Sequence, residues 1–243
     1  MTPNIIAVYH ERVTTALVLS AGGMYAAWEA GVWKALAPHL RPDLIVGASA
    51  GAWNGWAIAG GAAPEELERE WLDASLASVR VLRAEPLHRR ARELWSRYRP
   101  RVPFGLVVVE TPRFRERLVR DAEITWRHLA ATASIPGLFP PVRVDGRLCV
   151  DGGLLGHLPL WAAREMGATR AIGVNCLTGL PTRILREVLY RRQPVPGLQV
   201  VSIVPSEPLG SLRDSIVWSR TKIERWIELG ERDGRQALRS IPM

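Results

Sequence analysis

Short apolar runs alternate with helical patterns in the first part of the chain. The run Thr15–Leu19 (TALVL) predicts a buried strand, because β-branched and aliphatic residues suit a strand covered on both faces. A glycine turn follows, and residues 24–36 then carry small residues at helical spacing, which predicts a closely packed helix. Residues 44–51 repeat the strand and the turn, and a helix-compatible stretch without charges follows them. Two such units in succession predict parallel strands with right-handed crossovers.

The rest of the pattern continues this alternation. Apolar residues at helical spacing predict helices over residues 64–79 and 212–237, and a short surface helix is expected at 114–119. Apolar runs predict strands at residues 104–109, 142–144, 148–150, 171–175 and 199–204. Asp145 and Gly146 stand between the second and third of these strands and predict a hairpin. Because no linker, repeat or low-complexity tract interrupts the pattern, we expect residues 1–243 to form one α/β domain with a mainly parallel sheet.

Composition places few limits on the partners of the protein. Hydrophobic residues make up 47% of the chain and charged residues 23%, as in ordinary globular proteins. The formal charge of +8 would suit nucleic acid or an anionic membrane surface. Only Lys34 and Lys222 are lysines, however, and such a bias toward arginine can reflect base composition. We therefore give the charge little weight and expect no nucleic-acid partner.

One basic segment leaves two interpretations open. Residues 80–101 contain eight arginines with Trp95 and Tyr98 among them. Such a stretch could lie on a lipid interface, with aromatic rings at headgroup depth and arginines near phosphates. A solvated helix whose aromatic residues pack inward explains the same residues, and we favour it because the apolar stripe is not clean. Peripheral contact with an anionic membrane surface stays open.

The cysteines and the start of the chain favour a cytoplasmic protein. Cys149 and Cys176 are too few for a disulfide framework and are expected to be buried thiols in a reducing compartment. The first sixteen residues lack a secretory signal pattern. Residues 44–63 carry no charge, but their five glycines, Ser49 and Asn54 fit a buried strand and helix better than a membrane span.

The segment Gly47-Ala48-Ser49-Ala50-Gly51 matches the G-x-S-x-G nucleophile elbow. In such an elbow the serine occupies a strained turn from strand to helix, and the glycines let neighbouring backbone approach closely. Its hydroxyl then stands at the carboxyl end of a strand, beside amides that can stabilise an oxyanion. For the pentapeptide alone, a turn that packs a helix tightly on a sheet is an equally good explanation.

A serine nucleophile also needs a base, and no histidine is well placed. In α/β-hydrolases the histidine follows the serine and the acid on a late loop, whereas no histidine follows His157 here. Asp151 fits better, because it follows the strand at 148–150 and should project from the carboxyl edge of the sheet. Gly152 and Gly153 would let the loop approach Ser49, although Asp-Gly-Gly is also a common turn. The remaining histidines are expected to be surface or core residues: His10, His39, His88 and His128.

The turn after the first strand offers an oxyanion hole. Amides of Gly22 and Gly23 can point at an acyl oxyanion together with the amide of Ala50. A dinucleotide-binding turn is the rival interpretation, but it would require glycine where Ala21 and Ala26 stand.

Four motifs occur in one order: LVLSAGGMYAAWEAGVWKAL at residues 17–36, GASAG at 47–51, SIPGLFPP at 134–141, and DGR followed by VDGG at 145–153. Together they resemble the patatin-like phospholipase family over about residues 15–175, and residues 198–239 would complete the domain. The resemblance implies a three-layer α/β/α fold, a Ser49-Asp151 dyad without histidine, no metal or cofactor, and hydrolysis of acyl esters in lipids. It also implies that Gly22 and Gly23 are the retained oxyanion turn.

The chain departs from the family pattern at three positions of the glycine turn. The pattern G-G-G-x-[RK]-G is replaced by Ala21, Gly22, Gly23, Met24, Tyr25 and Ala26. An alanine at a position that needs positive φ would be strained, and loss of the basic residue removes an anchor. Gly156 and His157 also replace the Asn-rich segment that often follows D-G-G.

The predicted function is therefore that of a serine lipid acyl hydrolase, in which Ser49 forms an acyl-enzyme and Asp151 moves the proton. The same acyl-enzyme would also allow transfer to an acceptor other than water. The altered glycine turn leaves a third possibility open, a binding or scaffold protein with a degenerate site.

Overall fold

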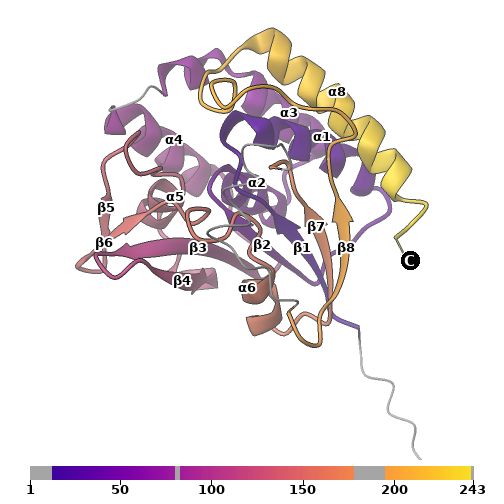
Figure 1. The fold of residues 1–243 in the computed structure, drawn as a ribbon, viewed down its shortest axis with the longest axis horizontal. Coiled ribbons are helices and arrows are strands. Elements are labelled where there is room, and N and C mark those ends of the chain that lie inside the picture. The colour runs from indigo at the N-terminus through magenta and orange to yellow at the C-terminus, as the bar shows by residue number, and fades with distance from the viewer. Residues whose placement is uncertain (1–12, 80–82, 178–194, 242–243) are drawn as a thin grey trace, which may run out of the picture.

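The computed structural model describes residues 13–79, 83–177 and 195–241. Within these residues, eight strands form one mixed sheet with the order β5-β6-β3-β2-β1-β7-β8, and β4 also pairs with β3. The five central strands run parallel to one another (Figure 1). Their bounds are β1 (Thr15–Leu19), β2 (Leu44–Ala48), β3 (Phe104–Thr111), β7 (Arg170–Val174) and β8 (Gln199–Ile203). The α/β class and the mainly parallel sheet expected from the sequence are confirmed.

Three antiparallel strands complete the sheet at the β3 side. The hairpin β5 (Val142–Val144) and β6 (Arg147–Val150) turns at Asp145 and Gly146, as predicted. The short helix expected at residues 114–119 is wrong, because β4 (Arg115–Arg120) pairs with β3 there. The open edge of β3 offers a ladder along residues 105–110, whereas a helix this short would be marginal by itself.

Helices cover both faces of the sheet. α6 (Leu160–Glu165) lies on one face, and a larger group of helices lies on the other, with α8 (Arg220–Ala237) packed along α1 (Ala26–Leu36) (Figure 1). Alternation along β1 serves both layers: Leu17 and Leu19 join the larger core, and Ala16 and Val18 face α6. The other helices of the larger group are α2 (Ala50–Ala59), α3 (Pro64–Leu72), α4 (Ala84–Arg97) and α5 (Trp126–Thr132). Short 3-10 turns are η1 (Gly23–Tyr25), η2 (Ala74–Ser78) and η3 (Asp121–Glu123).

Two predicted helices are shorter than expected. The helix predicted over residues 64–79 ends at Leu72, because the Asp73 carboxylate accepts the Ser75 N–H at 2.8 Å and starts η2. The helix predicted over residues 212–237 begins only at Arg220. In the preceding turn, the Asp214 carboxylate accepts both the N–H and the hydroxyl of Ser211, so local polar contacts replace helical ones.

The basic segment at residues 80–101 forms α4 over most of its described part, and Arg80 lies outside the described residues. Tyr98 is buried, and the indole of Trp95 donates to the carbonyl of Ile124 at 3.1 Å. Arg90 is buried as well and pairs with Glu70. The favoured interpretation, a helix whose aromatic residues pack inward, is confirmed. No helix among the described residues combines the length and the apolar sequence that crossing a bilayer requires.

Candidate active site

Ser49 occupies a strained turn between β2 and α2. Its backbone angles are φ 53° and ψ −131°, a combination that residues with side chains rarely adopt. The adjacent glycines allow close packing around it. A Cβ on Gly47 would lie 2.6 Å from Cα of Ala52, and one on Gly51 would lie 2.3 Å from the carbonyl oxygen of Ser20. The local geometry therefore has the form of a nucleophile elbow.

The strand register brings Ser49 and Asp151 together. β4 occupies one edge of β3 along residues 105–110, so β2 and β6 must share the other edge. β2 pairs as far as Val107, and β6 begins its pairing two residues further along β3. Because β6 runs antiparallel, its last residue points back toward the end of β2. The two strands thus end facing each other, and the next residues are Ser49 and Asp151.

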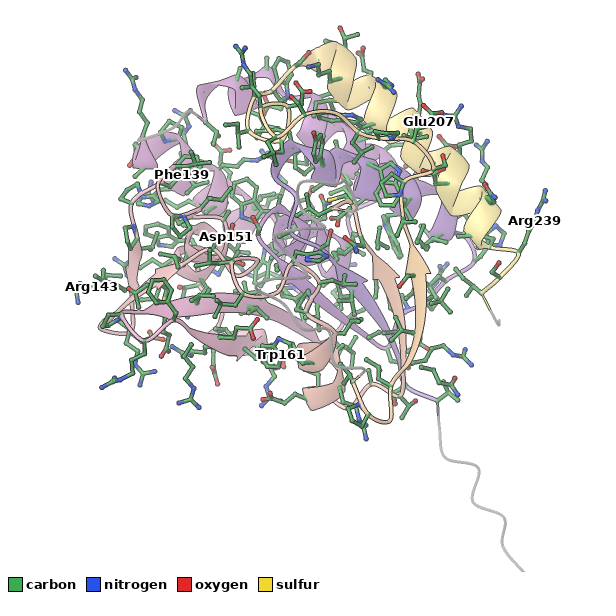
Figure 2. All side chains as sticks on the ribbon, viewed as in Figure 1. Phe139, Arg143, Asp151, Trp161, Glu207 and Arg239 are labelled. Atoms are coloured by element: carbon green, nitrogen blue, oxygen red, sulfur yellow. The ribbon has the colours of Figure 1, made fainter. Side chains whose placement is uncertain are left out.

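This arrangement corrects one expectation. The sequence predicted that Asp151 projects from the carboxyl edge of the sheet after the strand at 148–150, as it would at the end of a parallel strand. β6 is antiparallel to β3, so Asp151 approaches that edge from the opposite direction. It reaches the right level only because β3 extends beyond the end of β2 and gives β6 a place to pair. Figure 2 shows Asp151 in the interior of the molecule, above β3.

The Asp151 carboxyl is buried and incompletely hydrogen-bonded. Its exposed fraction is 5%, and Oδ1 accepts the Gly153 N–H at 2.7 Å. Oδ2 has no hydrogen-bond partner among the described residues. Burial raises the pKa of Asp151 to about 7, while interactions with the Ser49 hydroxyl and the Gly153 N–H act to lower it. A carboxyl with a pKa near neutrality and a free oxygen can take up and release a proton at neutral pH.

Thr132 joins the segments after β2 and β6 that carry these residues, and it is not among the site residues predicted from the sequence. Its hydroxyl accepts the Ser49 N–H at 3.0 Å and donates to the carbonyl of Val107 at 2.6 Å. Its own carbonyl accepts the Gly152 N–H at 3.1 Å. The signal was a lone threonine among the alanines of residues 130–133 (AATA), directly before the SIPGLFPP motif.

The glycine turn keeps a glycine where the backbone needs one. Gly23 has φ +56°, and a Cβ on Gly22 would lie 2.1 Å from Sγ of Cys176. Ala21 and Ala26 do not have positive φ, so the strain expected from these alanines is absent. Gly23 lines the same pocket as Ser49 and Ala50, whereas Gly22 packs against Cys176. Within the described chain, no group accepts a hydrogen bond from the N–H of Gly23 or Ala50.

Tyr25 provides an anchor where the family pattern has a basic residue. Its hydroxyl donates to the carbonyl of Ser211 at 2.5 Å, and its ring meets that of Trp226 edge-on at 5.0 Å. Burial, with a smaller effect from the charge of Asp214, raises the pKa of Tyr25 to about 12, so the phenol stays protonated. Tyr25 therefore connects η1 to α8 and to the loop before it.

A second buried carboxyl, Glu29, lies behind the glycine turn. It accepts the N–H and the hydroxyl of Ser20, each at 2.9 Å, and Nδ2 of Asn54 at 3.2 Å. Burial raises the pKa of Glu29 to about 8 despite these hydrogen bonds. Glu29 thus connects the end of β1 with α2, and it is not among the residues predicted from the sequence.

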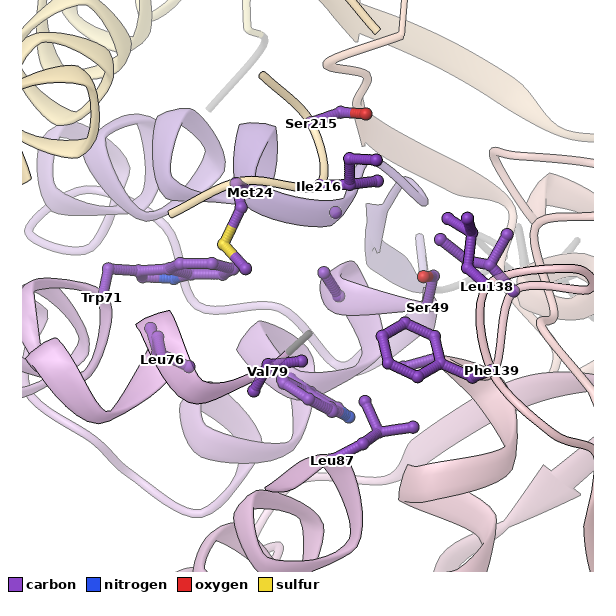
Figure 3. Close-up of a pocket in the computed structure, with 15 residues that line it drawn as sticks. Met24, Ser49, Trp71, Leu76, Val79, Leu87, Leu138, Phe139, Ser215 and Ile216 are labelled. Carbon is purple, nitrogen blue, oxygen red and sulfur yellow. The ribbon is translucent and has the colours of Figure 1, made fainter. Parts of the chain in front are cut away.

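Ser49 opens into an apolar pocket (Figure 3). Ser49 and Ala50 both line it, and Figure 3 shows Leu138 and Phe139 beside the serine, Ile216 above it and Trp71 across the pocket. The remaining wall is almost wholly apolar and includes Met24, Trp53, Trp71, Leu76, Val79 and Leu87. Such a pocket can hold a hydrocarbon chain but offers few partners to a polar ligand.

The described histidines do not line this pocket. His128 is buried on α5, where Nδ1 accepts the Thr125 N–H, and burial lowers its pKa. His88 packs against Trp126, and the carbonyl of His157 accepts the Ala21 N–H at 2.7 Å. His10 lies outside the described residues.

Comparisons with known proteins agree with these features. The family model described as patatin-like phospholipase matches residues 17–108 and 99–164. Patatin-like phospholipase domain-containing protein 6 of Mus musculus is 28% identical over 188 residues, which cover 67% of this chain and 13% of that protein. Patatin-like phospholipase domain-containing protein 7 of Rattus norvegicus is 26% identical over 186 residues, 66% of this chain and 13% of that protein. The chain thus spans a small part of the length of these relatives.

Among solved structures, VipD from Legionella pneumophila is similar with a TM-score of 0.52 and 12% sequence identity. The alignment covers 94% of this chain and 67% of VipD. At this identity the similarity concerns the fold, and it confirms the patatin-like fold expected from the sequence.

Proposed function

Because the chain belongs to the patatin-like phospholipase family, we propose that it is a lipid acyl hydrolase with Ser49 as nucleophile and Asp151 as base. One observation carries this proposal. The strained Ser49 lines an apolar pocket, and its hydroxyl acts on the buried Asp151 carboxyl, whose Oδ2 has no other hydrogen-bond partner in the described chain. The names of the relatives refer to phospholipases, which agrees with a lipid ester as substrate.

In the proposed acylation step, ionised Asp151 takes the proton from the Ser49 hydroxyl while Oγ bonds to the acyl carbonyl carbon. The carbonyl oxygen becomes an oxyanion, which the N–H groups of Gly23 and Ala50 stabilise, with Gly22 beside them. The bond to the alcohol then breaks, and protonated Asp151 gives its proton to the departing oxygen. The acyl group remains as an ester on Ser49.

Deacylation repeats the same proton transfers with water. Asp151 removes a proton from a water molecule as its oxygen bonds to the acyl carbon, and the proton then passes to Oγ of Ser49. The fatty acid leaves, and both side chains return to their starting states. The apolar pocket would hold the acyl chain throughout, so the hydrocarbon leaves water and its position fixes the carbonyl.

The experiment is intact-mass detection of a covalent adduct with a fluorophosphonate. We expect one adduct on the wild-type protein, no adduct on Ser49→Ala, and a strongly slowed reaction of Asp151→Asn. Ser215→Ala and Asp145→Asn are the matched controls, because Ser215 also lines the pocket and Asp145 lies on the hairpin before β6. Both controls should react like the wild type.

An adduct that persists in Ser49→Ala, or that forms on Ser215, would contradict the proposed nucleophile. If a folded wild-type protein forms no adduct, the degenerate binding or scaffold protein becomes the better explanation. Hydrolysis of soluble short-chain esters by the labelled and unlabelled protein then shows whether the reactive serine supports turnover.

A further inference from the structure

Two loops frame the opening of the apolar pocket. Residues 135–141 contribute Ile135, Leu138 and Phe139 to its wall. Residues 212–217, between β8 and α8, contribute Ser215 and Ile216. Figure 3 shows Leu138 and Phe139 on one side of Ser49 and Ile216 on another. We call these two loops the apolar rim.

The rim also exposes apolar side chains that do not line the pocket. Leu212 is 61% exposed and Val217 is 47% exposed, and both belong to one short turn. The other loop presents the exposed residues Pro136, Pro140 and Pro141. Large apolar side chains are usually buried, and those exposed together beside an apolar pocket mark an interaction surface.

Positive charge accompanies the rim, and its one acid is neutralised. The rim contains a single carboxylate, Asp214, which forms an ion pair with Lys222. Arg213 on the rim and Arg143 just after it have no ion-pair partner among the described residues. A surface with exposed apolar groups, unpaired cations and no free carboxylate complements an anionic lipid surface.

The turn at residues 212–217 is held by hydrogen bonds from η1. The Met24 N–H donates to the carbonyl of Ser215 at 2.8 Å, and the Tyr25 hydroxyl donates to the carbonyl of Ser211. These contacts hold the turn against η1. The side chains of Leu212 and Val217 remain exposed to solvent. The exposed side chains are therefore fixed by contacts to the core and are presented in one arrangement.

We propose that the apolar rim inserts into the surface of an anionic lipid bilayer and places the pocket opening against the lipid. An acyl chain then passes from the bilayer into the pocket without crossing water. This inference rests on the proposed function for its substrate, but the surface itself can be tested separately. It also moves membrane contact away from the arginine-rich α4, whose aromatic residues pack inward.

The experiment compares two double variants of the full chain. Leu212→Ser with Val217→Ser changes the rim, and Val13→Ser with Val200→Ser is the matched control. Val13 is 48% exposed and Val200 is 40% exposed, and both lie near the amino ends of parallel strands, away from the rim. Binding is measured by sedimentation with phosphatidylcholine vesicles with and without phosphatidylglycerol, and hydrolysis with the same vesicles and with a soluble short-chain ester.

We expect the wild type and the control to bind phosphatidylglycerol vesicles more strongly than pure phosphatidylcholine vesicles. The rim variant should lose roughly tenfold to a hundredfold in partition coefficient, because two apolar side chains no longer leave water. Its hydrolysis of vesicle lipid should fall by a similar factor, and its hydrolysis of the soluble ester should stay within about twofold of the wild type.

Equal vesicle binding by the rim variant and the wild type, or an equal loss in both double variants, would overturn the proposal. So would self-association of the wild type that the rim variant abolishes in light scattering without any vesicle binding, because the rim would then be a protein interface. If vesicle binding depends on the rim but no ester is hydrolysed, the proposed function fails while the lipid-binding surface stands.

Discussion

Asp151 and Glu29 are both buried carboxyls, and in both burial raises the pKa, to about 7 and about 8. They differ in how their oxygens are used. Glu29 receives three hydrogen bonds from Ser20 and Asn54, shared between both of its oxygens. Asp151 receives one from Gly153 and leaves Oδ2 without a partner in the described chain. A raised pKa shows only that a group is buried, whereas a free oxygen beside Ser49 allows proton transfer.

The positions of Glu29 and Asp151 in the fold agree with this difference in hydrogen bonding. Glu29 lies on α1 and joins the end of β1 to α2, so its hydrogen bonds connect elements of the core. Asp151 lies where two strand ends face each other, and the hydrogen bonds of its loop come from backbone groups and the Asp151 carboxylate, with Ser134 and Thr132 as partners from the preceding segment. We therefore expect Glu29 to govern stability and Asp151 to govern turnover.

The largest expected effect is the loss of activity in Asp151→Asn. An amide cannot accept the Ser49 proton, so kcat/KM for a soluble ester should fall by roughly 10³-fold to 10⁴-fold. Urea unfolding should show a fold at least as stable as the wild type, because the amide removes a buried ionisable group. A Glu29→Gln variant with an equal loss of kcat/KM would remove the distinction between the two carboxyls.

Glu29 should control how stability depends on pH. Its pKa is about 8 in the folded protein against the ordinary 4.5 of a glutamate, so its contribution is full below pH 4.5 and decreases as pH rises toward 8. Asp151 acts in the same direction, but it is already half ionised at about pH 7, so it contributes mainly below that pH. Between pH 7 and pH 8, the free energy of unfolding should therefore fall by up to about 1.4 kcal/mol in the wild type and less in Glu29→Gln.

Urea denaturation at pH 5, 6, 7 and 8 measures this slope, with Asp151→Asn as the companion variant. That variant should keep most of the wild-type slope between pH 7 and pH 8 and lose a larger part of it below pH 7. An unchanged slope in Glu29→Gln over the whole range would show that Glu29 is not the titrating group.

The rate should follow the ionisation of Asp151 and not that of Glu29. The base must be ionised to accept a proton, so kcat/KM should rise with pH through about 7 and drop about tenfold per pH unit below it. Glu29→Gln should show the same midpoint, whatever its stability. Rates with a soluble ester between pH 5 and pH 8 provide the profile. A midpoint that moves in Glu29→Gln would show that Glu29, and not Asp151, sets the pH dependence of the rate.

The smallest expected effect concerns Thr132, which holds the backbone at Ser49 and at Gly152, next to Asp151. Thr132→Val removes the hydroxyl that accepts the Ser49 N–H and donates to Val107. We expect kcat to fall roughly tenfold with little change in KM, because the reacting groups lose their alignment while the pocket is kept. Thr132→Ser keeps the hydroxyl and should restore most of kcat. Equal losses in both variants would show that packing of the methyl group matters instead.

Much of the fold could be predicted from local pattern. The apolar runs identified β1, β2 and β3, and Asp145-Gly146 identified the hairpin. Residues 114–119 could not be assigned in this way, because β4 depends on the open edge of β3, which is a long-range partner. Likewise, the turn at residues 212–217 has a helical spacing of apolar residues, but Asp214 and Ser211 decide its backbone.

The candidate site shows the same division. GASAG and VDGG stand out in the sequence because glycines at fixed spacing allow close backbone approach, and the structure supplies the contacts that require it. Glu29 and Thr132 have no such spacing. Their roles depend on distant partners: Asn54 is 25 positions from Glu29, and Ser49 is 83 positions from Thr132. Residues of this kind become visible only when the elements are placed in space.

The end-to-end meeting of β2 and β6 has a consequence for the order of folding. Ser49 and Asp151 are about a hundred positions apart in the chain, and they meet only after β3 has paired with β2 on one stretch and with β6 on the next. Contacts between such distant segments form late, because closing a long loop costs chain entropy. During refolding, reactivity of Ser49 toward a fluorophosphonate should therefore appear after helical structure has formed. The rate at which Ser49 becomes labelled would therefore report the rate of the last stage of sheet assembly.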